Sequence, residues 1–456
     1  MPFFLTEFCN FDIIHAMNER KTLKINDKRH LEIGGADCVE LAQKFHTPLY
    51  VFDEKHIRDM MSIYRDTLSN EYGNGMVLYA SKAFSCMAVY AIAKQEGIGV
   101  DVVSGGELYT AIQAGFPAER ICMHGNNKLP EEISYALDCG VGLIVIDSQT
   151  EAERLEEEAK KRNLVQDVLL RINPGVEAHT HAFVQTATTD SKFGFSVSNG
   201  TAEQMVKSLL SFPHLRLMGY HCHIGSQIFE KQSFCVAAEK CLHFAHEMKE
   251  KLHFEPKTLN LGGGFGIWYT DEDKKTSVDG YREYLTAMLG AVKKGCKQYG
   301  LTLPRILIEP GRSIVGEAGI TLYTVGSIKE IPGVKKYLAV DGGMFDNPRY
   351  CLYGSKYTAL LANRAAESPC EVVTIAGKCC ESGDVIVSQA ALPEAKVGDI
   401  VAVLSTGAYN YSMASNYNRN LIPPAVLVKD GRTEYIIKPQ TYSDLVRSDV
   451  IPKSLQ

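Results

Sequence analysis

Short apolar runs alternate with longer amphipathic segments between residues 76 and 311. The first four runs begin 23, 22 and 22 residues apart, and each is almost continuously apolar. Such runs, separated by helical segments, are typical of a parallel sheet covered on both faces. Eight of them predict an α/β protein with a (β/α)8 barrel of the TIM type, and an open doubly wound sheet is the alternative. The runs are 76–81, 99–104, 121–125, 143–147, 167–174, 215–225, 258–264 and 305–311.

The pattern changes after about residue 318. Runs such as "ITLYTVGSIKEI", "EVVTIAG" and "AVLVKDGRTEYIIK" have strand character and are interrupted by Gly, Pro and Asp. They predict a C-terminal β domain of sandwich or barrel-like form. The N-terminal stretches "KTLKIND" and "HLEIGG" are expected to be strands of that same domain. We therefore predict N-terminal strands within 1–45, the barrel within 46–317, and the β domain within 318–456.

Composition and charge narrow the class of partner. The chain has 456 residues, of which 45% are hydrophobic and 22% are charged, and its net charge is -6. This balance gives no reason to expect a nucleic acid or an anionic membrane as partner. No stretch is long and apolar enough to predict a transmembrane helix, and the N-terminal twenty residues are a poor signal peptide. Thirteen scattered cysteines favour reduced thiols, so we expect a cytoplasmic protein.

Candidate chemistry follows four of the predicted strands. In a barrel of this kind the active site lies at the C-terminal ends of the strands. Reactive and glycine-rich residues should therefore meet at one mouth of the barrel. In chain order these residues are Lys82, then His221, His223, Ser226 and Gln227, then Gly262 to Gly266, and finally Glu309 to Arg312.

Pyridoxal phosphate is the ligand that satisfies these groups together. A lysine amine can bind its aldehyde, glycine turns and a serine can bind its phosphate, and a carboxylate can pair with its pyridine nitrogen. Each group also has an ordinary explanation, since a lysine after a strand is usually solvated and a glycine turn is often structural. The "HCH" motif offers only two ligands on one strand face, so we expect no metal. We expect His221 to be a core residue or a support for a site residue rather than a catalyst.

The chain resembles the diaminopimelate decarboxylases, which belong to the alanine-racemase-like, fold type III pyridoxal-phosphate enzymes. The resemblance extends almost from end to end and rests on many separate motifs. They include "YASKAF", "DVVSGGEL", "HCHIGSQI", "LNLGGGFG", "IEPGRSIV", "DNPRYCLYGSKY", "CCESGD", "GAYNYSMASNYN" and "YSDLVRSDVIP".

The resemblance implies a role for each matching residue. The implied catalytic residues are Lys82, which carries the cofactor, His223 on the face of the pyridine ring, Glu309 at the pyridine nitrogen, and Cys380 as proton donor. The implied cofactor-binding residues are Lys82, His223, Ser226, Gly262, Gly263, Gly264, Glu309, Pro310, Gly311, Arg312 and Tyr409. The implied substrate-binding residues are Arg312, Arg349, Tyr353, Glu381 and Tyr409.

The resemblance also implies the reaction and the assembly. The expected reaction is the decarboxylation of meso-2,6-diaminopimelate to L-lysine and CO2, the last step of lysine biosynthesis by the diaminopimelate route. The expected assembly is a homodimer in which Cys380 and Glu381 complete the partner's site. The chain departs from the family at Phe84, where many members have Asn. The pair Cys379-Cys380 leaves a register question, and we choose Cys380 because it directly precedes "ESGD".

Three other functions remain as alternatives. A decarboxylase of ornithine, arginine or a carboxylated polyamine such as carboxynorspermidine would favour acidic residues where this chain has Arg312 and Arg349. A racemase of the same fold could use Cys380 as a second base, but it lacks the context of the "CESGD" and "NPRY" motifs. A non-enzymatic cofactor-binding protein would lack Lys82, Glu309 or Cys380, and all three are present.

Overall fold

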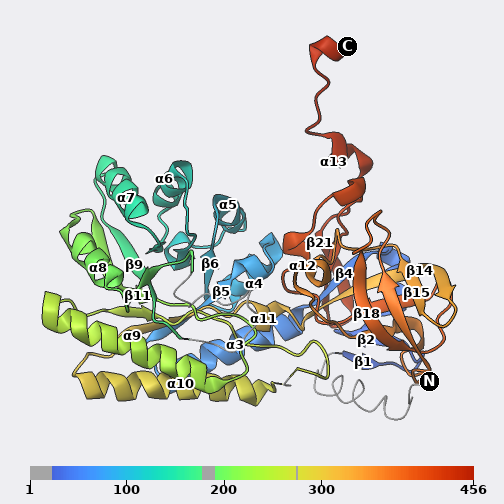
Figure 1. The fold of residues 1–456 in the computed structure, drawn as a ribbon, viewed down its shortest axis with the longest axis horizontal. Helices are drawn as coiled ribbons and strands as arrows, with labels where there is room; N and C mark the ends of the chain where they lie inside the picture. Colours follow the sequence, from blue (N-terminus) through green and yellow to red (C-terminus); the bar gives the residue numbers. More distant parts are fainter. Residues whose placement is uncertain (1–22, 177–190, 274–275) are drawn as a thin grey trace. The chain divides into compact units, whose positions relative to one another are not determined.

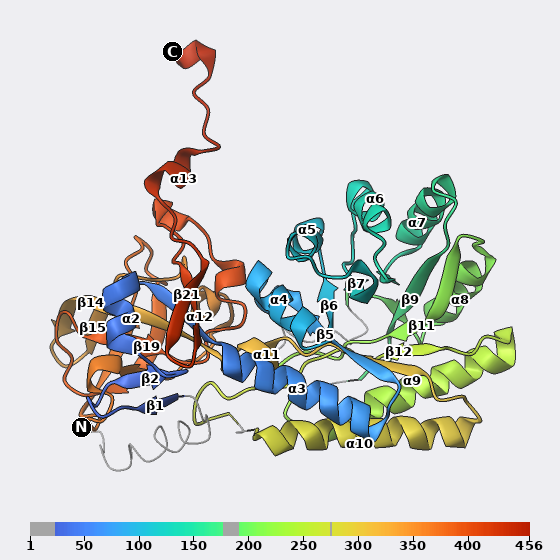
Figure 2. The same ribbon diagram turned by 180° about the vertical axis from the view of Figure 1, so that it is seen from behind.

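The computed structural model describes residues 23–176, 191–273 and 276–456, and these form two compact units (Figures 1 and 2). The expectation that the N-terminal twenty residues are not a signal peptide lies outside the described residues. The barrel unit consists of described residues between 58 and 314, without 268–273. The β unit consists of the described residues before 58, residues 268–273 and the chain from 315 onward.

Eight parallel strands close into a ring in the barrel unit. Their order is β5-β6-β7-β8-β9-β11-β12-β13, and β13 pairs with β5 through Ile306 and Gly75. This closing pair confirms the barrel and excludes the open sheet. A ninth short strand, β10 (Phe195–Ser196), extends β9. The ring strands are β5 (Gly75–Ala80), β6 (Gly99–Val102), β7 (Ile121–Met123), β8 (Leu143–Ile146), β9 (Gln166–Asn173), β11 (Leu215–His221), β12 (Thr258–Asn260) and β13 (Arg305–Ile308).

One helix precedes the first ring strand and the others follow the strands, and the helices lie on the outside of the barrel (Figure 1). Serine residues in the short strand-to-helix loops start two of them: Ser104 accepts the Glu107 N–H at 3.2 Å, and Ser148 accepts the Glu151 N–H at 3.2 Å. The helices are α3 (Glu54–Glu71), α4 (Met87–Gln95), α5 (Gly105–Gln113), α6 (Pro130–Cys139), α7 (Gln149–Lys161), α8 (Thr201–Ser211), α9 (Lys231–Leu252), α10 (Val278–Tyr299) and α11 (Arg312–Val315). The 3-10 turns are η1 (Ser81–Ala83) and η2 (Ala118–Arg120).

The interior of the barrel is packed with apolar side chains. Leu78, Cys122, Val145, Leu169 and Leu307 come from five different strands and form one buried cluster. Such a filled core leaves polar chemistry to the mouth at the C-terminal ends of the strands.

The β unit contains a large mixed sheet and a small antiparallel one (Figure 2). The large sheet has the order β18-β17-β15-β14-β4-β20-β21, and β19 joins β14 to β16. Its strands are β4 (Leu49–Asp53), β14 (Gly319–Ile331), β15 (Lys335–Val340), β16 (Ala359–Leu361), β17 (Glu371–Ala376), β18 (Val385–Leu392), β19 (Ile400–Val403), β20 (Ala425–Lys429) and β21 (Arg432–Ile437). The small sheet holds β1 (Leu23–Ile25), β2 (Leu31–Ile33) and β3 (Ala36–Asp37). The separate β domain is therefore confirmed.

Helix α2 (Cys38–Phe45) connects the two sheets through one core. Asp37 caps the helix by accepting the Val39 N–H at 2.8 Å. Buried residues of α2, of β1 and β2, and of β4, β14 and β20 belong to the same apolar cluster. Strand β4 pairs with β14 and β20, so its run "LYVFD" belongs to the β unit although it follows residue 45.

The remaining short elements of the β unit lie in its loops. They are α12 (Arg349–Tyr353), α13 (Tyr442–Val446), η4 (Ala362–Arg364), η5 (Tyr411–Met413), η6 (Tyr417–Arg419) and η7 (Lys453–Leu455). Among the described residues no helix combines the length and the apolar character needed to cross a membrane. The cysteines within the described ranges are free thiols.

Candidate active site

Lys82 lies in η1, directly after barrel strand β5. Its neighbours fix this turn: the Ser81 hydroxyl donates to Glu107 Oε2 at 2.8 Å, and the Tyr79 hydroxyl donates to the Phe84 carbonyl at 2.9 Å. Phe84 is fully buried, whereas the side chain of Lys82 is exposed. The turn therefore leaves Lys82 exposed. Phe84, the residue that departs from the family pattern, packs into the core.

Glu309 follows β13 and receives hydrogen bonds from the ends of three other strands. Its Oε1 atom lies 2.8 Å from His124 Nε2 and accepts the Asn260 amide at 2.6 Å. Its Oε2 atom lies 3.3 Å from His221 Nε2. These residues follow or end β7, β12 and β11, so the carboxylate lies at the centre of the barrel mouth.

The buried charges around Glu309 control its protonation. Burial alone would raise the pKa of Glu309, but His124 and His221 outweigh it and hold that pKa well below its usual value. Burial opposes protonation of His124, yet the Glu309 carboxylate holds the pKa of His124 well above its usual value. Burial lowers the pKa of His221 to about 4, so this ring is neutral. Glu309 is thus an ionised carboxylate paired with a protonated His124.

Asp101 on β6 is a second buried carboxyl group near Lys82 and Glu309. Burial, followed by the charge of Glu309, raises its pKa to about 7, and the charges of His124 and Lys82 oppose that rise. Its Oδ1 atom has no hydrogen-bond partner among the described residues. Two acids therefore share the mouth, one ionised and one able to hold a proton near neutral pH.

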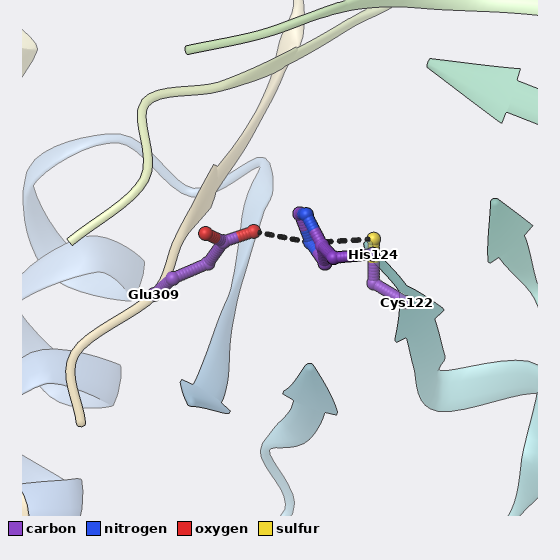
Figure 3. A group of neighbouring side chains, drawn as sticks. All are labelled: Cys122, His124 and Glu309. Carbon is purple, nitrogen blue, oxygen red and sulfur yellow. Dashed lines mark hydrogen bonds and ion pairs between the residues drawn. The ribbon is translucent and has the colours of Figure 1, made fainter. Parts of the chain in front are cut away.

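Cys122, His124 and Glu309 form a short chain of buried polar groups (Figure 3). The Cys122 sulfur lies 3.4 Å from His124 Nε2, and the same nitrogen faces Glu309. Their ligand atoms lie within 4.8 Å of one another, which is close enough for a metal ion. Both contacts use His124 Nε2, so one N–H is shared between the Glu309 carboxylate and the Cys122 sulfur.

His223 and the glycine turn after β12 contact each other. The Gly263 N–H donates to His223 Nδ1 at 3.3 Å, and burial, then the charges of Lys82 and Arg171, hold the pKa of His223 well below its usual value. The ring is therefore neutral. A Cβ on Gly262 would lie 2.5 Å from the Cys222 carbonyl, and a Cβ on Gly263 would overlap the Glu309 carbonyl. Only glycines let these loops approach so closely.

Arg312 joins the loops after β11 and β13. Its Nη2 atom donates to Ser226 Oγ at 3.0 Å, and its side chain is buried. The preceding Gly311 packs against Ala80, and Pro310 accepts the Ala80 N–H at 3.1 Å. This segment therefore abuts the end of β5, two residues before Lys82.

Arg349 lies in the β unit between two tyrosine rings. Its guanidinium carbon lies 5.2 Å from the ring centre of Tyr353 and 5.3 Å from that of Tyr409. The side chain is buried, and its Nε atom has no hydrogen-bond partner among the described residues. Tyr409 has a φ of 68°, a left-handed conformation that is uncommon for a bulky residue and worth a functional explanation.

Cys379 and Cys380 occupy different environments in the loop before β18. Burial and the nearby Asp384 raise the pKa of Cys379 to about 12, and its sulfur accepts from the Asn420 amide at 3.7 Å. Cys380 and Glu381 are exposed, and the Cys380 N–H donates to Asn418 Oδ1 at 2.8 Å. Cys380 is therefore the more accessible thiol of the pair.

The predicted residues divide between the two units. The barrel unit brings together Lys82, His223, Ser226, Gly262, Gly263, Gly264, Glu309, Pro310, Gly311 and Arg312. The β unit holds Arg349, Tyr353, Cys380, Glu381 and Tyr409, of which Arg349, Tyr353 and Tyr409 contact one another.

Sequence reasoning did not single out His124, Asp101 or Asn260. Each is a polar residue within or directly after an apolar barrel strand, which is the same signal that identified Lys82. His221, expected to be a core residue or a support for the site, is buried with its Nε2 atom 3.3 Å from Glu309 Oε2.

Residues 55–316 match the family model of pyridoxal-dependent decarboxylases, in its pyridoxal-binding domain. The fold and the site thus define a barrel enzyme that uses pyridoxal phosphate. Diaminopimelate decarboxylase of Bacillus subtilis (strain 168) is 50% identical over 429 residues, which cover 94% of this chain and 97% of the relative. The chain belongs to the diaminopimelate decarboxylase family of pyridoxal-dependent carboxy-lyases, so the predicted family, enzyme class and cofactor are confirmed.

Solved structures of the same family have the same fold. The crystal structure of diaminopimelate decarboxylase from M. jannaschii in complex with L-lysine has a TM-score of 0.87 and 34% identity, covering 96% of this chain and all of that one. The lysine complex of the Helicobacter pylori enzyme has a TM-score of 0.81 and 29% identity, covering 90% of this chain and 98% of that one.

Proposed function

We propose that this protein decarboxylates meso-2,6-diaminopimelate to L-lysine and CO2. The observation that carries the proposal is the buried Arg349 guanidinium, whose recorded contacts are the Tyr353 and Tyr409 rings and the Ser355 hydroxyl rather than a carboxylate. Buried charges are normally paired, so this site calls for an anionic ligand. Diaminopimelate has a second carboxylate that can pair with Arg349, whereas ornithine and arginine have only one carboxylate.

The residues of the barrel unit fit pyridoxal phosphate. The exposed amine of Lys82 would hold the cofactor covalently. The ionised Glu309 would accept a hydrogen bond from the pyridine N–H and keep that nitrogen protonated. The neutral His223 would lie on the ring face. Ser226, Arg312 and the turn Gly262–Gly264 offer a hydroxyl, a guanidinium and close backbone approach for the phosphate.

When bound, the cofactor supplies an electron sink for the pair that the departing carboxylate leaves on the substrate. The protein must hold that carboxylate perpendicular to the ring, and the contacts of Arg349, Tyr353 and Tyr409 would set this orientation by fixing the far end of the substrate. An arginine can bind a carboxylate with two parallel hydrogen bonds, which gives direction as well as charge.

Cys380 would then donate a proton to the substrate carbon that lost CO2. Its exposure supports this role over Cys379, whose thiol is turned toward Asn420 and Asp384. We propose a cytoplasmic homodimer in which Cys380 and Glu381 of each chain complete the site of the other.

The test is product analysis with the purified protein and pyridoxal phosphate. Release of CO2 and lysine should occur with meso-diaminopimelate and not with ornithine, arginine or lysine. Decarboxylation of ornithine or arginine instead would overturn the assigned role of Arg349 and favour the alternative decarboxylases. For the assembly, a mixture of Lys82→Ala and Cys380→Ala proteins should recover activity that neither has alone.

A further inference from the structure

Two loops of the β unit meet at one buried carboxylate, Asp384. Its side chain lies at the end of the loop Cys379–Asp384, just before β18. Oδ1 accepts the Met344 N–H at 2.6 Å, and Oδ2 accepts the Cys379 N–H at 2.7 Å. Met344 belongs to the segment 342–348, which leads into α12 and therefore into Arg349.

The packing around this carboxylate requires glycine on both sides. A Cβ on Gly343 would lie 2.6 Å from Asp384 Oδ2, and a Cβ on Gly377 would overlap both carboxylate oxygens. Further bonds join the two loops: the Lys378 N–H donates to the Gly342 carbonyl at 3.0 Å, and the Cys351 thiol donates to the Gly383 carbonyl at 2.7 Å. The two loops are thus built around Asp384.

The chemistry of the contact demands an aspartate. Each carboxylate oxygen accepts a backbone N–H, and the Cys379 thiol also hydrogen-bonds this carboxylate, so both side-chain oxygens must be acceptors. An asparagine would turn its NH2 group toward one of these donors and leave that N–H unsatisfied in a buried place. The side chain of Asp384 accepts hydrogen bonds from the backbone N–H groups of Met344 and Cys379, so this carboxylate holds the backbone of the two loops.

We propose that Asp384 is a positioning residue that couples the Cys380 loop to the Arg349 segment. The roles of the two loops rest on the proposed function, in which Cys380 serves the partner's site and Arg349 serves the site of its own chain. Asp384 then makes the geometry of one active site depend on that of the other. Because it is buried, Asp384 itself does not touch substrate.

Hydrogen–deuterium exchange of the full-length protein tests the coupling without using activity. In Asp384→Asn, amides in peptides covering 343–349 and 378–384 should exchange at least tenfold faster, while those of β19 and β20 should not change. Asp399→Asn is the control for loss of a buried carboxylate elsewhere in the same unit, since Asp399 accepts the Lys396 N–H at 2.7 Å and also pairs with Arg364. Unchanged exchange in 343–349 would overturn the proposal.

A second variant guards against a misfolded Asp384→Asn protein. Gly343→Ala keeps Asp384 but adds a Cβ that clashes with its carboxylate. Amide exchange in both peptides should therefore become faster, as in Asp384→Asn. Loosening of 378–384 alone in this variant would contradict the coupling.

Mixed dimers separate this inference from the proposed function. With Lys82→Ala in one chain, only the other chain's site works. Asp384→Asn on the Lys82→Ala chain should lower kcat several-fold through Cys380, and on the other chain it should raise KM through Arg349. Equal effects from both placements would overturn the coupling. A loss of kcat that appears only when Asp384→Asn is on the active chain would overturn the shared site only, and the exchange experiment would still decide on Asp384.

Discussion

His124 Nε2 lies 2.8 Å from Glu309 Oε1, although the two residues follow strands β7 and β13, which are not neighbours in the barrel. Both side chains are buried, so the pair is an ion pair across the mouth of the barrel. A buried carboxylate stays ionised only when such a partner compensates it. His124 therefore helps to keep Glu309 ionised, which is the form that can pair with a protonated pyridine nitrogen.

His124→Asn should weaken the binding of pyridoxal phosphate at least tenfold. Removing one partner of a buried ion pair costs about 3–5 kcal/mol, and the pKa of Glu309 would rise toward neutrality. The loss should be larger at pH 6 than at pH 8, because Glu309 is more protonated at the lower pH. Cofactor titration followed by absorbance measures this, and His214→Asn, which removes a His–Glu pair with Glu156 elsewhere in the barrel unit, is the control. Binding within twofold of the wild type at both pH values would contradict the role of His124.

Lys82→Ala should lower turnover by ~10³-fold or more, since the cofactor loses its covalent attachment and the reaction loses the lysine amine. The melting temperature should stay close to that of the wild type because the side chain is exposed. Lys94→Ala changes another lysine of the barrel unit, which bonds the Gly115 carbonyl, and it should leave the rate unchanged. A Lys82→Ala protein with near-wild-type turnover would refute the covalent role.

The barrel could be predicted because its strands have a strong and regular signal. Six of the eight ring strands fall within the predicted runs, and β5 and β9 begin one residue earlier, since buried parallel strands are apolar almost throughout. The run "LYVFD" has the same texture but lies in β4, which pairs with β14 and β20. Apolar content predicts that a strand is buried, and it does not say in which sheet the strand lies.

Local patterns located part of the site and missed its long-range pairs. Lys82 and Glu309 were found because each follows a strand and has its own chemistry. The partnership of His124, Asn260 and Glu309 exists only once the barrel has closed, since it joins residues on β7, β12 and β13. The link between Met344 and Cys379 through Asp384 likewise joins loops that are distant in sequence.

The two adjacent cysteines should behave differently. Cys380→Ala should lower kcat by ~10²-fold, the usual contribution of a general acid, with little effect on KM. Cys379→Ala should keep most of the activity, because its thiol has a pKa of about 12 and packs near Asn420. Steady-state kinetics on both variants decide the register, and a larger loss in Cys379→Ala would reverse the assignment.

Arg349→Met should raise KM for diaminopimelate by ~10²-fold, because a site built to pair a carboxylate loses its buried partner. The KM of Arg349→Lys should lie between those of the wild type and Arg349→Met, since lysine keeps the charge but cannot form two parallel hydrogen bonds with a carboxylate. Arg216→Met removes an exposed arginine that pairs with Asp167 on the barrel unit, and it should not change KM. An unchanged KM in Arg349→Met would remove Arg349 from the substrate site.

Asp346 should make the β unit less stable as the pH rises. This carboxyl group is fully buried, accepts the Tyr323 hydroxyl and the Gly343 N–H, and burial raises its pKa to about 8. The folded protein then keeps a proton that the unfolded chain releases near pH 4, so the stability that this proton provides is full below that pH and is lost as the pH rises to about 8. The slope contributed by one proton is at most about 1.4 kcal/mol per pH unit.

Urea unfolding of the wild type and of Asp346→Asn, measured from pH 5 to pH 8, isolates this contribution. The difference in unfolding free energy between the two proteins should shrink by roughly 1 kcal/mol per pH unit across that range, because asparagine cannot titrate. Asp449→Asn changes an exposed aspartate paired with Arg419, and it should leave the pH dependence of the wild type intact. A pH-independent difference for Asp346→Asn would mean that Asp346 is ionised throughout the range and that its buried charge is compensated by the Tyr323 hydroxyl and the Gly343 amide alone.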